Sequence, residues 1–594
     1  MSDGSSANKT TEYLKRHIDL VLALVAAVIL WTVLGVAFDY YYELNDDVLI
    51  KDIIAGVYTG LPDGHNNQMM YPISILLAGL YRLLPSLPWF GLFEIGCFIA
   101  AFIMITSCLS SLVASVRSKC AVSVLTLLTF FGLYTWELVM LQYTVVCGIL
   151  CAAAAVWLYT RKTVTIKTVI PSIVLCILAY NVRSEMFLLM CPFLAACGIS
   201  KWCDEASGAT AAPKNTAESA ESGGATASDV AADKNDATDG ATAGSISIGQ
   251  RLGRYAGVLA IIALGVAATF IIDKVAYSSG EWSEYRRFFD ARTDVYDFTG
   301  IPPYEDNYEF YESKGITSAQ YELLTDYNFA LDDEIDSEVL EEIAAYVKSG
   351  EAIGAHGSPK GVRTAVREYV SGAIDFTMDD STVSGFADEA NQLIPMNLIV
   401  IVLYVCLIET AYLTHDKTWL IKLPTWIVLR SIPWVYIYMK GRLVPRITHP
   451  MYMIEILVLG AMIVGAVAQV RWLRALAAIL IAVTCIVYIP TSVSYVNSAS
   501  NMRMSANTSR DEVYGMTQAD SDNYYYLDVY STTGWTERVF ETRMNKRNTQ
   551  LAGGWIAKSP LDAIKQNSNH GEKLFLRVDN DEVKITKVGK DANE

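Results

Sequence analysis

The chain has 594 residues, of which 52% are hydrophobic, and a positive mean hydropathy of +0.29. An ordinary soluble multidomain protein is less apolar, and its apolar residues do not gather in blocks of about 20, the length that crosses a bilayer. The net charge of −17 argues against nucleic acid and against an anionic lipid surface as partners. The composition therefore predicts an α-helical polytopic membrane protein whose surroundings are the lipid bilayer.

Apolar runs that meet or approach the length of a membrane span occur along most of the chain. We count eleven of them, at 18–38, 88–114, 120–137, 138–160, 168–182, 185–200, 255–272, 395–414, 419–438, 450–470 and 473–490. The first run has no small-residue cleavage site, so it is interpreted as a retained helix and not as a signal peptide. The shorter run 70–84 contains Arg82 and is expected to be an interfacial or half-inserted helix.

The basic residues predict the orientation. Lys15 and Arg16 precede the first run, and Lys or Arg follows each even-numbered run. Short loops rich in Lys and Arg stay on the cytoplasmic side. The pattern predicts a multi-pass protein of a bacterial cell membrane, with a cytoplasmic N-terminus and an extracytoplasmic C-terminus.

Shifts in composition divide the chain into seven predicted parts. They are a cytoplasmic N-terminus (1–17), a membrane module (18–200) with a first outer loop (39–87), a cytoplasmic linker (201–254), a single helix (255–272), an acidic outer domain (273–394), the last membrane helices (395–490) and an outer C-terminal domain (491–594). Within the linker, 205–245 is mostly Ala, Gly, Ser, Thr and Asp and cannot bury a core, so disorder is expected. The acidic domain carries 26 Asp and Glu against 9 Lys and Arg.

Local patterns predict a folded acidic domain and a small α+β C-terminal domain. Thr317 with Gln320 three residues later is typical of a capping box, and "DSEVLEEIAAYVKSG" predicts an amphipathic helix that ends at Gly350. The runs "YYYLDVY", "TERVF" and "KLFLRV" predict strands. Neither outer domain contains any of the eleven cysteines, and no CxxC spacing occurs, so we expect no disulfide framework.

The loop after the first run carries the strongest chemical signal. "DYYYELNDD" places Asp46 and Asp47 side by side just outside the membrane, and "VLIKDIIAGVYTG" then predicts an amphipathic interfacial helix. A second juxtamembrane helix is expected to begin near Tyr71. The plain alternative is a solvated helix N-terminus, where the helix dipole favours two carboxylates.

One long helix, an outer loop containing Asn45-Asp46-Asp47, two juxtamembrane helices and many further spans resemble the GT-C superfamily of membrane glycosyltransferases. The resemblance covers the architecture of residues 12–490, and its motif is confined to 45–47 and their surroundings. It implies a GT-C-like fold of about eleven helices. It also implies transfer of a sugar from a polyprenyl-phosphate carrier to an envelope polysaccharide or glycolipid at the outer face. Asp46 or Asp47 would be the catalytic carboxylate of the first loop, acting as general base.

The chemistry of the transfer suggests further residues. An acceptor hydroxyl needs a base for its proton, which a carboxylate supplies, and a leaving lipid phosphate needs cations. The candidate substrate-binding residues are Arg183, Glu185, Lys440, Arg442, Arg446, His449, Tyr71 and His65. Two alternatives stay open: Arg183 forms a salt bridge with Glu185, and the cluster 440–449 pairs with the acidic outer segment.

No cofactor is certain from the sequence. A divalent cation such as Mg or Mn is conceivable, held by Asp46 and Asp47, with His65 as a further ligand. Two other functions compete with the transferase. A transporter or flippase for a lipid-linked glycan predicts charged residues deep within several helices. A polymerase or ligase for such glycans needs no dedicated acid in the first loop.

Overall fold

The computed structural model describes residues 17–207, 247–354, 360–373, 377–378, 392–393, 395–466, 470–541, 544–562, 571–579 and 582–588. Most of the predicted linker, at 208–246, lies outside these residues, as do parts of the acidic and C-terminal domains. The two helices that flank the linker extend into its predicted range, since one ends at Ala206 and the next begins at Ile248.

Ten helices in the described part of the chain are long and apolar enough to cross a membrane. They are α2 (Ile18–Ala37), α5 (Trp89–Ser111), α6 (Val116–Leu133), α8 (Tyr143–Thr160), α10 (Ser184–Ala206), α11 (Ile248–Ala276), α17 (Pro395–Thr414), α18 (Trp419–Lys440), α19 (Pro445–Val464) and α20 (Arg471–Ala519). The remaining predicted run, 168–182, forms the shorter apolar helix η1 (Lys167–Val169) and α9 (Ile170–Val182). The class of polytopic helical membrane protein is thus confirmed.

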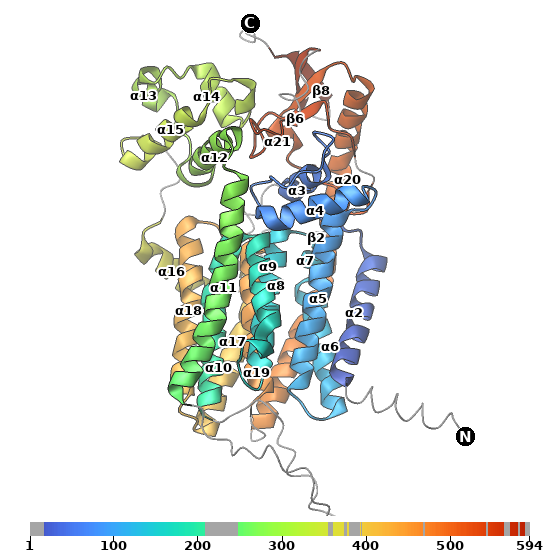
Figure 1. Ribbon diagram of the computed structural model, residues 1–594, viewed down its shortest axis with the longest axis vertical. Coiled ribbons are helices and arrows are strands. Elements are labelled where there is room, and N and C mark those ends of the chain that lie inside the picture. Colours follow the sequence, from blue (N-terminus) through green and yellow to red (C-terminus); the bar gives the residue numbers. More distant parts are fainter. Residues whose placement is uncertain are drawn as a thin grey trace, which may run out of the picture.

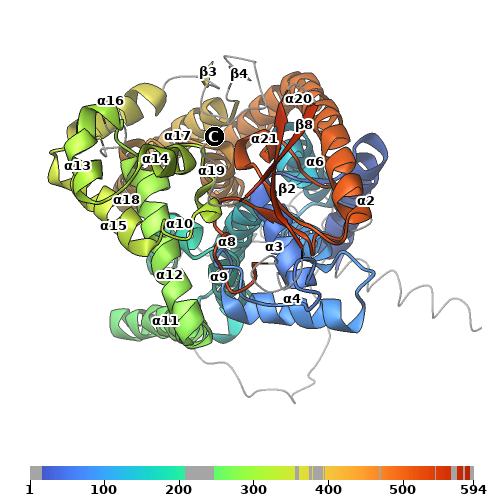
Figure 2. The same ribbon diagram turned by 90° about the horizontal axis from the view of Figure 1, so that it is seen from above.

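The helices stand roughly parallel in one bundle, and a cap covers one end of it (Figure 1). Two short helices of the first loop, α3 (Asn45–Ala55) and α4 (Tyr71–Leu83), lie across this capped end, as Figure 2 shows from above. The short strand β1 (Tyr41–Tyr42) pairs in parallel with β2 (Met140–Leu141), which follows the single-turn helix α7 (Thr135–Val139). The first loop is therefore tied to the bundle directly before α3 begins.

The cap has a helical part and a sheet part. The helical part comprises α12 (Gly280–Thr293), the π-helical turn η2 (Asp294–Thr299), η3 (Glu305–Asn307), α13 (Tyr308–Ser313), α14 (Ser318–Thr325), η4 (Phe329–Leu331) and α15 (Ser337–Ser349). The predicted capping box of Thr317 and Gln320 forms, and α15 ends at Gly350 with a positive φ of 81°. Next to the bundle lie α16 (Val362–Ala373) and the antiparallel pair β3 (Thr377–Met378) and β4 (Gln392–Leu393).

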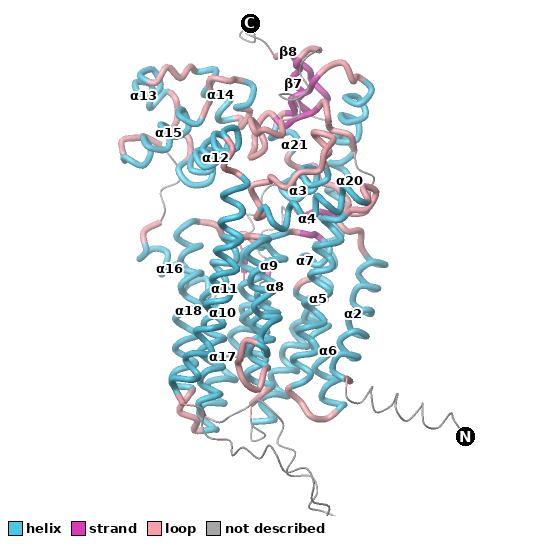
Figure 3. Tube along the Cα trace, viewed as in Figure 1, coloured by secondary structure: helices cyan, strands magenta, loops and turns pink. Residues whose placement is uncertain are grey.

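The sheet part has four strands in the order β6-β5-β7-β8, and Figure 3 shows it at the capped end, above a bundle that is almost entirely helical. The strands are β5 (Tyr524–Leu527), β6 (Thr549–Leu551), β7 (Lys573–Asp579) and β8 (Glu582–Lys587), with the turn α21 (Val529–Thr532) after β5. β5 pairs in parallel with β6 and β7, and β7 is antiparallel to β8. The predicted strand "TERVF" makes only an isolated bridge, between Arg538 and Tyr41.

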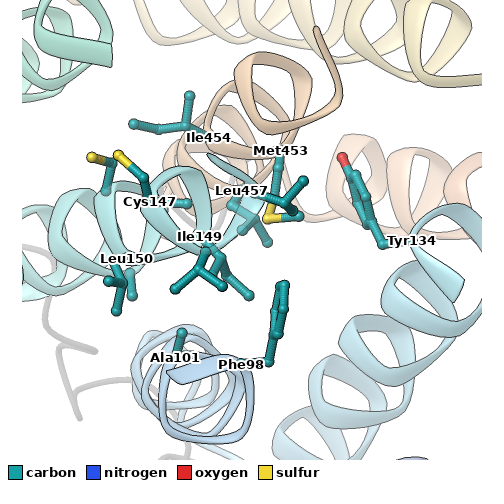
Figure 4. Packing of buried hydrophobic residues seen from close by; sticks show 14 of the residues in the cluster. Phe98, Ala101, Tyr134, Cys147, Ile149, Leu150, Met453, Ile454 and Leu457 are labelled. Atoms are coloured by element: carbon teal, nitrogen blue, oxygen red, sulfur yellow. The ribbon is translucent and has the colours of Figure 1, made fainter. Parts of the chain in front are cut away.

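The centre of the bundle is a close-packed apolar core. α8 lies inside it, in contact with α5, α9, α10 and α19, and its small residues let these neighbours approach closely. A Cβ on Gly148 would lie 2.2 Å from the Pro450 ring, so only glycine fits there. Figure 4 shows Phe98 and Ala101 of α5 facing Ile149 of α8, with Leu457 of α19 beside them.

Two helix boundaries differ from the sequence prediction for clear reasons. α8 starts at Tyr143 and not at 138, because the side chain of Gln142 accepts hydrogen bonds from the Thr144 and Val145 N–H groups and caps the helix. The last run continues as α20 to Ala519, a helix of 49 residues and about 74 Å. Only about 30 Å is needed to span hydrocarbon, so its second half extends into the cap.

Candidate functional site

The two adjacent carboxylates of the first loop lie in the first turn of α3, and their surroundings differ. Asp47 is fully buried, and its Oδ1 accepts a hydrogen bond of 3.1 Å from the backbone N–H of Tyr143, while Oδ2 has no partner. Burial raises the pKa of Asp47 well above its ordinary value, and the carboxylates of Glu43 and Asp46 raise it further. Asp47 therefore connects the starts of two helices and is closed to solvent.

Asp46 is the accessible member of the pair. Its side chain is partly exposed, and its Oδ1 accepts a hydrogen bond of 2.8 Å from the indole N–H of Trp555. Trp555 belongs to the C-terminal region, so the cap reaches down to the first loop at this point. An accessible carboxylate whose orientation is set by a neutral donor is able to accept a proton from a ligand.

Arg183 lies at the junction of α9 and α10, and its guanidinium contacts Gln68 of the first loop. It donates to the backbone carbonyl of Gln68 at 3.3 Å and also to the Gln68 side-chain oxygen. The hydroxyl of Tyr143 donates to that same oxygen at 3.0 Å, and the Tyr143 ring lies 5.3 Å from the guanidinium carbon. Because the Tyr143 backbone N–H also bonds Asp47, the acids of the first loop and this cation meet at one residue, and Asp46 attracts Arg183 electrostatically.

The predicted salt bridge between Arg183 and Glu185 is also present, at 3.1 Å. The Glu185 side chain is 71% exposed, and an exposed pair of this kind contributes little to stability. The alternative from the sequence, a salt bridge with Glu185, is therefore confirmed, and another edge of the same guanidinium contacts Gln68.

A second cation comes from the start of α19. Arg446, in the first turn of α19, is close enough to Glu43 and Tyr143 to act on both electrostatically. Glu43 also accepts a hydrogen bond of 3.3 Å from the Trp136 indole, and Arg503 of α20 donates to its backbone carbonyl at 2.9 Å. Burial raises the pKa of Glu43, and the two arginines oppose that shift.

His449, one turn after Arg446 on α19, forms a pair with a buried acid that the sequence did not single out. Its Nδ1 is hydrogen-bonded to Oε1 of Glu137 in α7, while Oε2 of Glu137 has no partner. Glu137 interacts electrostatically with Glu43. Contacts and electrostatic interactions through Tyr143, Glu43 and Glu137 therefore link the predicted residues Asp46, Asp47, Arg183, Arg446 and His449.

Four other predicted residues lie elsewhere. His65 bonds Asp63 at 2.6 Å and stacks on Trp282, with ring centroids 4.4 Å apart. Tyr71 packs on the His65 ring and begins α4, where its backbone N–H donates to Asp273 at 3.0 Å. These two residues attach the first loop to the end of α11 and the start of α12, where the cap begins.

Lys440 and Arg442 lie at the end of α18 against the helical part of the cap. Lys440 sits 4.4 Å from the Phe298 ring, and Arg442 forms a salt bridge of 3.2 Å with Asp297. For Arg442 the alternative from the sequence, pairing with the acidic segment, is therefore the arrangement found. Arg446 and His449 separate from this pair because they follow the turn into α19.

The donor set for a metal ion is incomplete in the described ranges. No group of three or more His, Cys, Asp or Glu side chains there is arranged to hold a metal ion. His65, the suggested third ligand, is occupied by Asp63 and the Ala276 carbonyl. The residues present do not fit a divalent cation bound by Asp46, Asp47 and His65 together.

A buried ionic network attaches α3 to the C-terminal region. Lys51 and Asp52 of α3 meet Glu537 and Lys546, and Lys546 lies 2.6 Å from Asp52 and 2.7 Å from Glu537. All four side chains are at most 5% exposed. The sequence predicted an interfacial amphipathic helix here, but α3 is enclosed between bundle and cap.

Sequence reasoning missed Gln68, Tyr143, Glu137 and Trp555. Tyr143 was hidden inside an apolar run, and the only local signal was the polar Gln142 that caps α8. Trp555 is more than 500 positions from Asp46, and no local pattern links them.

No protein family, curated protein or solved structure matches this chain. Fold and site define its class as a multi-pass helical membrane protein with an acid–arginine site beneath a cap.

Proposed function

We propose that the protein is a membrane glycosyltransferase that moves a sugar from a polyprenyl-phosphate carrier to an envelope polysaccharide or glycolipid. The capped end of the bundle is the extracytoplasmic face in this proposal, which agrees with the basic residues of the opposite loops. The observation that carries the proposal is that the adjacent acids and Arg183 meet at Tyr143, whose backbone N–H bonds Asp47 and whose ring lies 5.3 Å from the Arg183 guanidinium carbon. Arg446 also acts electrostatically on Tyr143. A base and two anion-binding cations are the minimum that this transfer needs.

The transfer has one bond-forming and one bond-breaking event. The acceptor oxygen attacks the anomeric carbon of the donor sugar, and the bond from that carbon to the phosphate oxygen breaks. The electron pair leaves with the lipid phosphate, whose charge Arg183 and Arg446 stabilise. The acceptor proton passes to the carboxylate of Asp46.

Asp46 suits the role of base better than Asp47. A base has to reach the hydroxyl whose proton it takes, and Asp47 is fully buried and already bonded to Tyr143 N–H. The role of Asp47 is to hold the start of α3 against α8, so that Asp46 keeps its orientation.

The test is transfer of sugar by membranes that carry Asp46→Asn or Asp47→Asn, compared with the unmodified protein at equal expression. Glu309→Gln, an exposed acid on α13, is the matched control. We expect Asp46→Asn to lower transfer by at least about 100-fold and the control to leave it unchanged. Full activity of inserted Asp46→Asn protein would contradict the proposal.

A transporter or flippase for a lipid-linked glycan is the second candidate, and one observation favours it. Arg430 of α18 and Glu455 of α19 form a salt bridge of 2.6 Å in the middle of their helices, and Tyr404 donates to Glu455 at 2.7 Å. Ionisable groups at membrane depth are functional candidates by default. If Asp46→Asn transfers sugar normally while Arg430→Gln abolishes export, this second function is favoured.

A further inference from the structure

A cavity near the candidate site is lined mainly by charged and aromatic side chains. It has a volume of about 680 Å³ and lies at the capped end, where three segments distant in sequence meet. These are residues 39–41 between α2 and the start of β1, residues 504–511 of α20, and residues 538–541 of the C-terminal region. A second cavity of about 490 Å³ shares Arg538, Phe540 and Glu541 with the first. The segment 538–541 thus forms a ridge with a hollow on each side.

The larger cavity is lined by two arginines and three carboxylates, and both arginines are paired. Arg538 pairs with Asp39 at 3.2 Å and donates to the Tyr41 hydroxyl at 2.9 Å. Arg510 pairs with Glu541 at 2.7 Å and with Asp511 at 2.8 Å. Because each arginine already has a carboxylate, the cavity offers no unpaired cation to a phosphate. The one carboxylate in excess is accounted for by Asp511, which shares Arg510 with Glu541 and is 59% exposed to solvent. A neutral ligand rich in hydroxyl groups fits it better, since both donors and acceptors are offered.

The aromatic side chains supply the other half of sugar recognition. Phe540 is 60% exposed although it is a large hydrophobic residue, and its ring meets Tyr40 edge-on at 6.1 Å. The flat C–H face of a pyranose packs on such a ring, while its hydroxyls reach the charged groups at the rim. A cavity in the range of roughly 300–1,000 Å³ encloses a ligand the size of about two or three sugar rings.

The cavity is joined to the candidate site by continuous structure. On α20, Arg503, Asn507 and Arg510 recur on one face; Arg503 donates to the Glu43 carbonyl, and the other two line the cavity. The ridge also holds β1, because Val539 N–H donates to the Tyr40 carbonyl at 2.9 Å and Tyr42 N–H to Glu537 at 3.0 Å. About one helical turn, roughly 5 Å along α20, therefore separates Asn507 of the cavity from Arg503, which contacts the first loop at Glu43.

We propose that this cavity is a subsite for a neutral oligosaccharide, occupied by the part of the acceptor chain that precedes the sugar receiving the transferred group. The inference rests on the proposed function, because an acceptor is defined only by a transfer. It specifies the acceptor class: a neutral glycan of several sugars, bound along α20 and the ridge, with its growing end at Asp46.

The test compares acceptors of different length. Neutral oligosaccharides released from the envelope polysaccharide of the producing cells are sorted by size and offered to the purified full chain. The variants are Phe540→Ala, which removes the aromatic platform, and Thr508→Trp, which fills the cavity from an exposed position. Tyr308→Ala, a half-exposed aromatic residue in the helical cap, is the control.

We expect both cavity variants to raise the KM for fragments of about three or more sugars by about tenfold, with kcat and the KM for a single-sugar acceptor unchanged. Hydrogen exchange provides a readout independent of catalysis: the long fragments should protect residues 504–511 and 538–541 in the unmodified protein and in Asp46→Asn. If the fragments give no such protection, or if Tyr308→Ala has the same effect as Phe540→Ala, the subsite is overturned. If Asp46→Asn keeps its transfer activity while protection occurs, the proposed base fails and the subsite stands.

Discussion

The carboxylate of Asp47 accepts a hydrogen bond from the backbone N–H of Tyr143, 96 positions further along the chain. This contact joins the first turn of α3 to the first turn of α8, the most enclosed helix of the bundle. Tyr143 then contacts Gln68 and Arg183 through its side chain. One residue thus connects the acids of the first loop to the cation at the α9–α10 junction.

The link through Tyr143 predicts a defect in donor binding when its hydroxyl is lost. Tyr143→Phe keeps the ring and the backbone N–H but removes the hydrogen bond to Gln68. The Gln68 side chain, which accepts from Arg183, then loses one of its positioning contacts. A hydrogen bond of this kind contributes about 1 kcal/mol. We expect KM for the lipid-linked donor to rise by about fivefold with little change in kcat, as measured by steady-state kinetics. A fall in kcat with an unchanged KM would instead mean that the hydroxyl acts on the chemical step.

The two arginines of the α18–α19 region are expected to differ in effect. Arg446 lies beside Glu43 and Tyr143, whereas Arg442 pairs with Asp297 of the cap. Arg446→Gln should lower transfer by at least about tenfold because a phosphate contact is lost, and Arg442→Gln should leave it within about twofold, as an exposed ion pair contributes little. Equal losses in a transfer assay would place the phosphate site elsewhere.

The buried network between α3 and the C-terminal region predicts a large effect on stability. Lys546→Met leaves Asp52 and Glu537 with the single cation Lys51 in a site closed to water. Breaking a buried ionic group in this way costs about 3–5 kcal/mol. Thermal unfolding of the detergent-solubilised protein should show a clear fall in Tm, and adding Glu537→Gln to Lys546→Met should recover part of it. A surface control, Lys584→Met on β8, should leave Tm unchanged.

The same network predicts a loss of stability in acid. Burial alone would raise the pKa of Glu537, but Lys51 and Lys546 outweigh that effect and hold the pKa far below its ordinary value. The folded protein thus binds fewer protons at Glu537 than the unfolded chain, so this stabilisation is complete above the ordinary glutamate pKa of about 4.3 and is lost as pH falls towards the folded pKa. Tm measured between about pH 6 and about pH 3 should fall more steeply for the unmodified protein than for Glu537→Gln.

The proposed orientation predicts which end of the bundle is reachable from outside the cell. The described outer domains contain no cysteine, so a single introduced thiol reports its own position. Ser318→Cys on α14 should react with a membrane-impermeant maleimide in intact cells. Lys162→Cys, exposed at the opposite end, should add labelling above that of the native cysteines in the unmodified protein only after lysis. The reverse pattern would place the candidate site in the cytoplasm.

The sequence by itself determined the class of the protein and most of its helices. Long apolar runs form helices because a bilayer leaves no other partner for backbone N–H and C=O groups, and each of the eleven predicted runs contains a helix in its described part. Local signals were equally reliable where the stabilising partner is a few residues away, as in the Thr317 capping box. Asp46 and Asp47 could be singled out because two adjacent acids at a membrane boundary form a local pattern.

Only the tertiary structure distinguished the two acids. Asp47 is buried because α8 begins against it, and Asp46 is oriented by an indole from the far end of the chain. The same holds for the separation of Arg446 from Arg442 and for the enclosure of α3 beneath the C-terminal region. Such contacts arise from packing between segments hundreds of residues apart, where burial and hydrogen-bond geometry, and not the identity of neighbouring residues, decide which side chains meet.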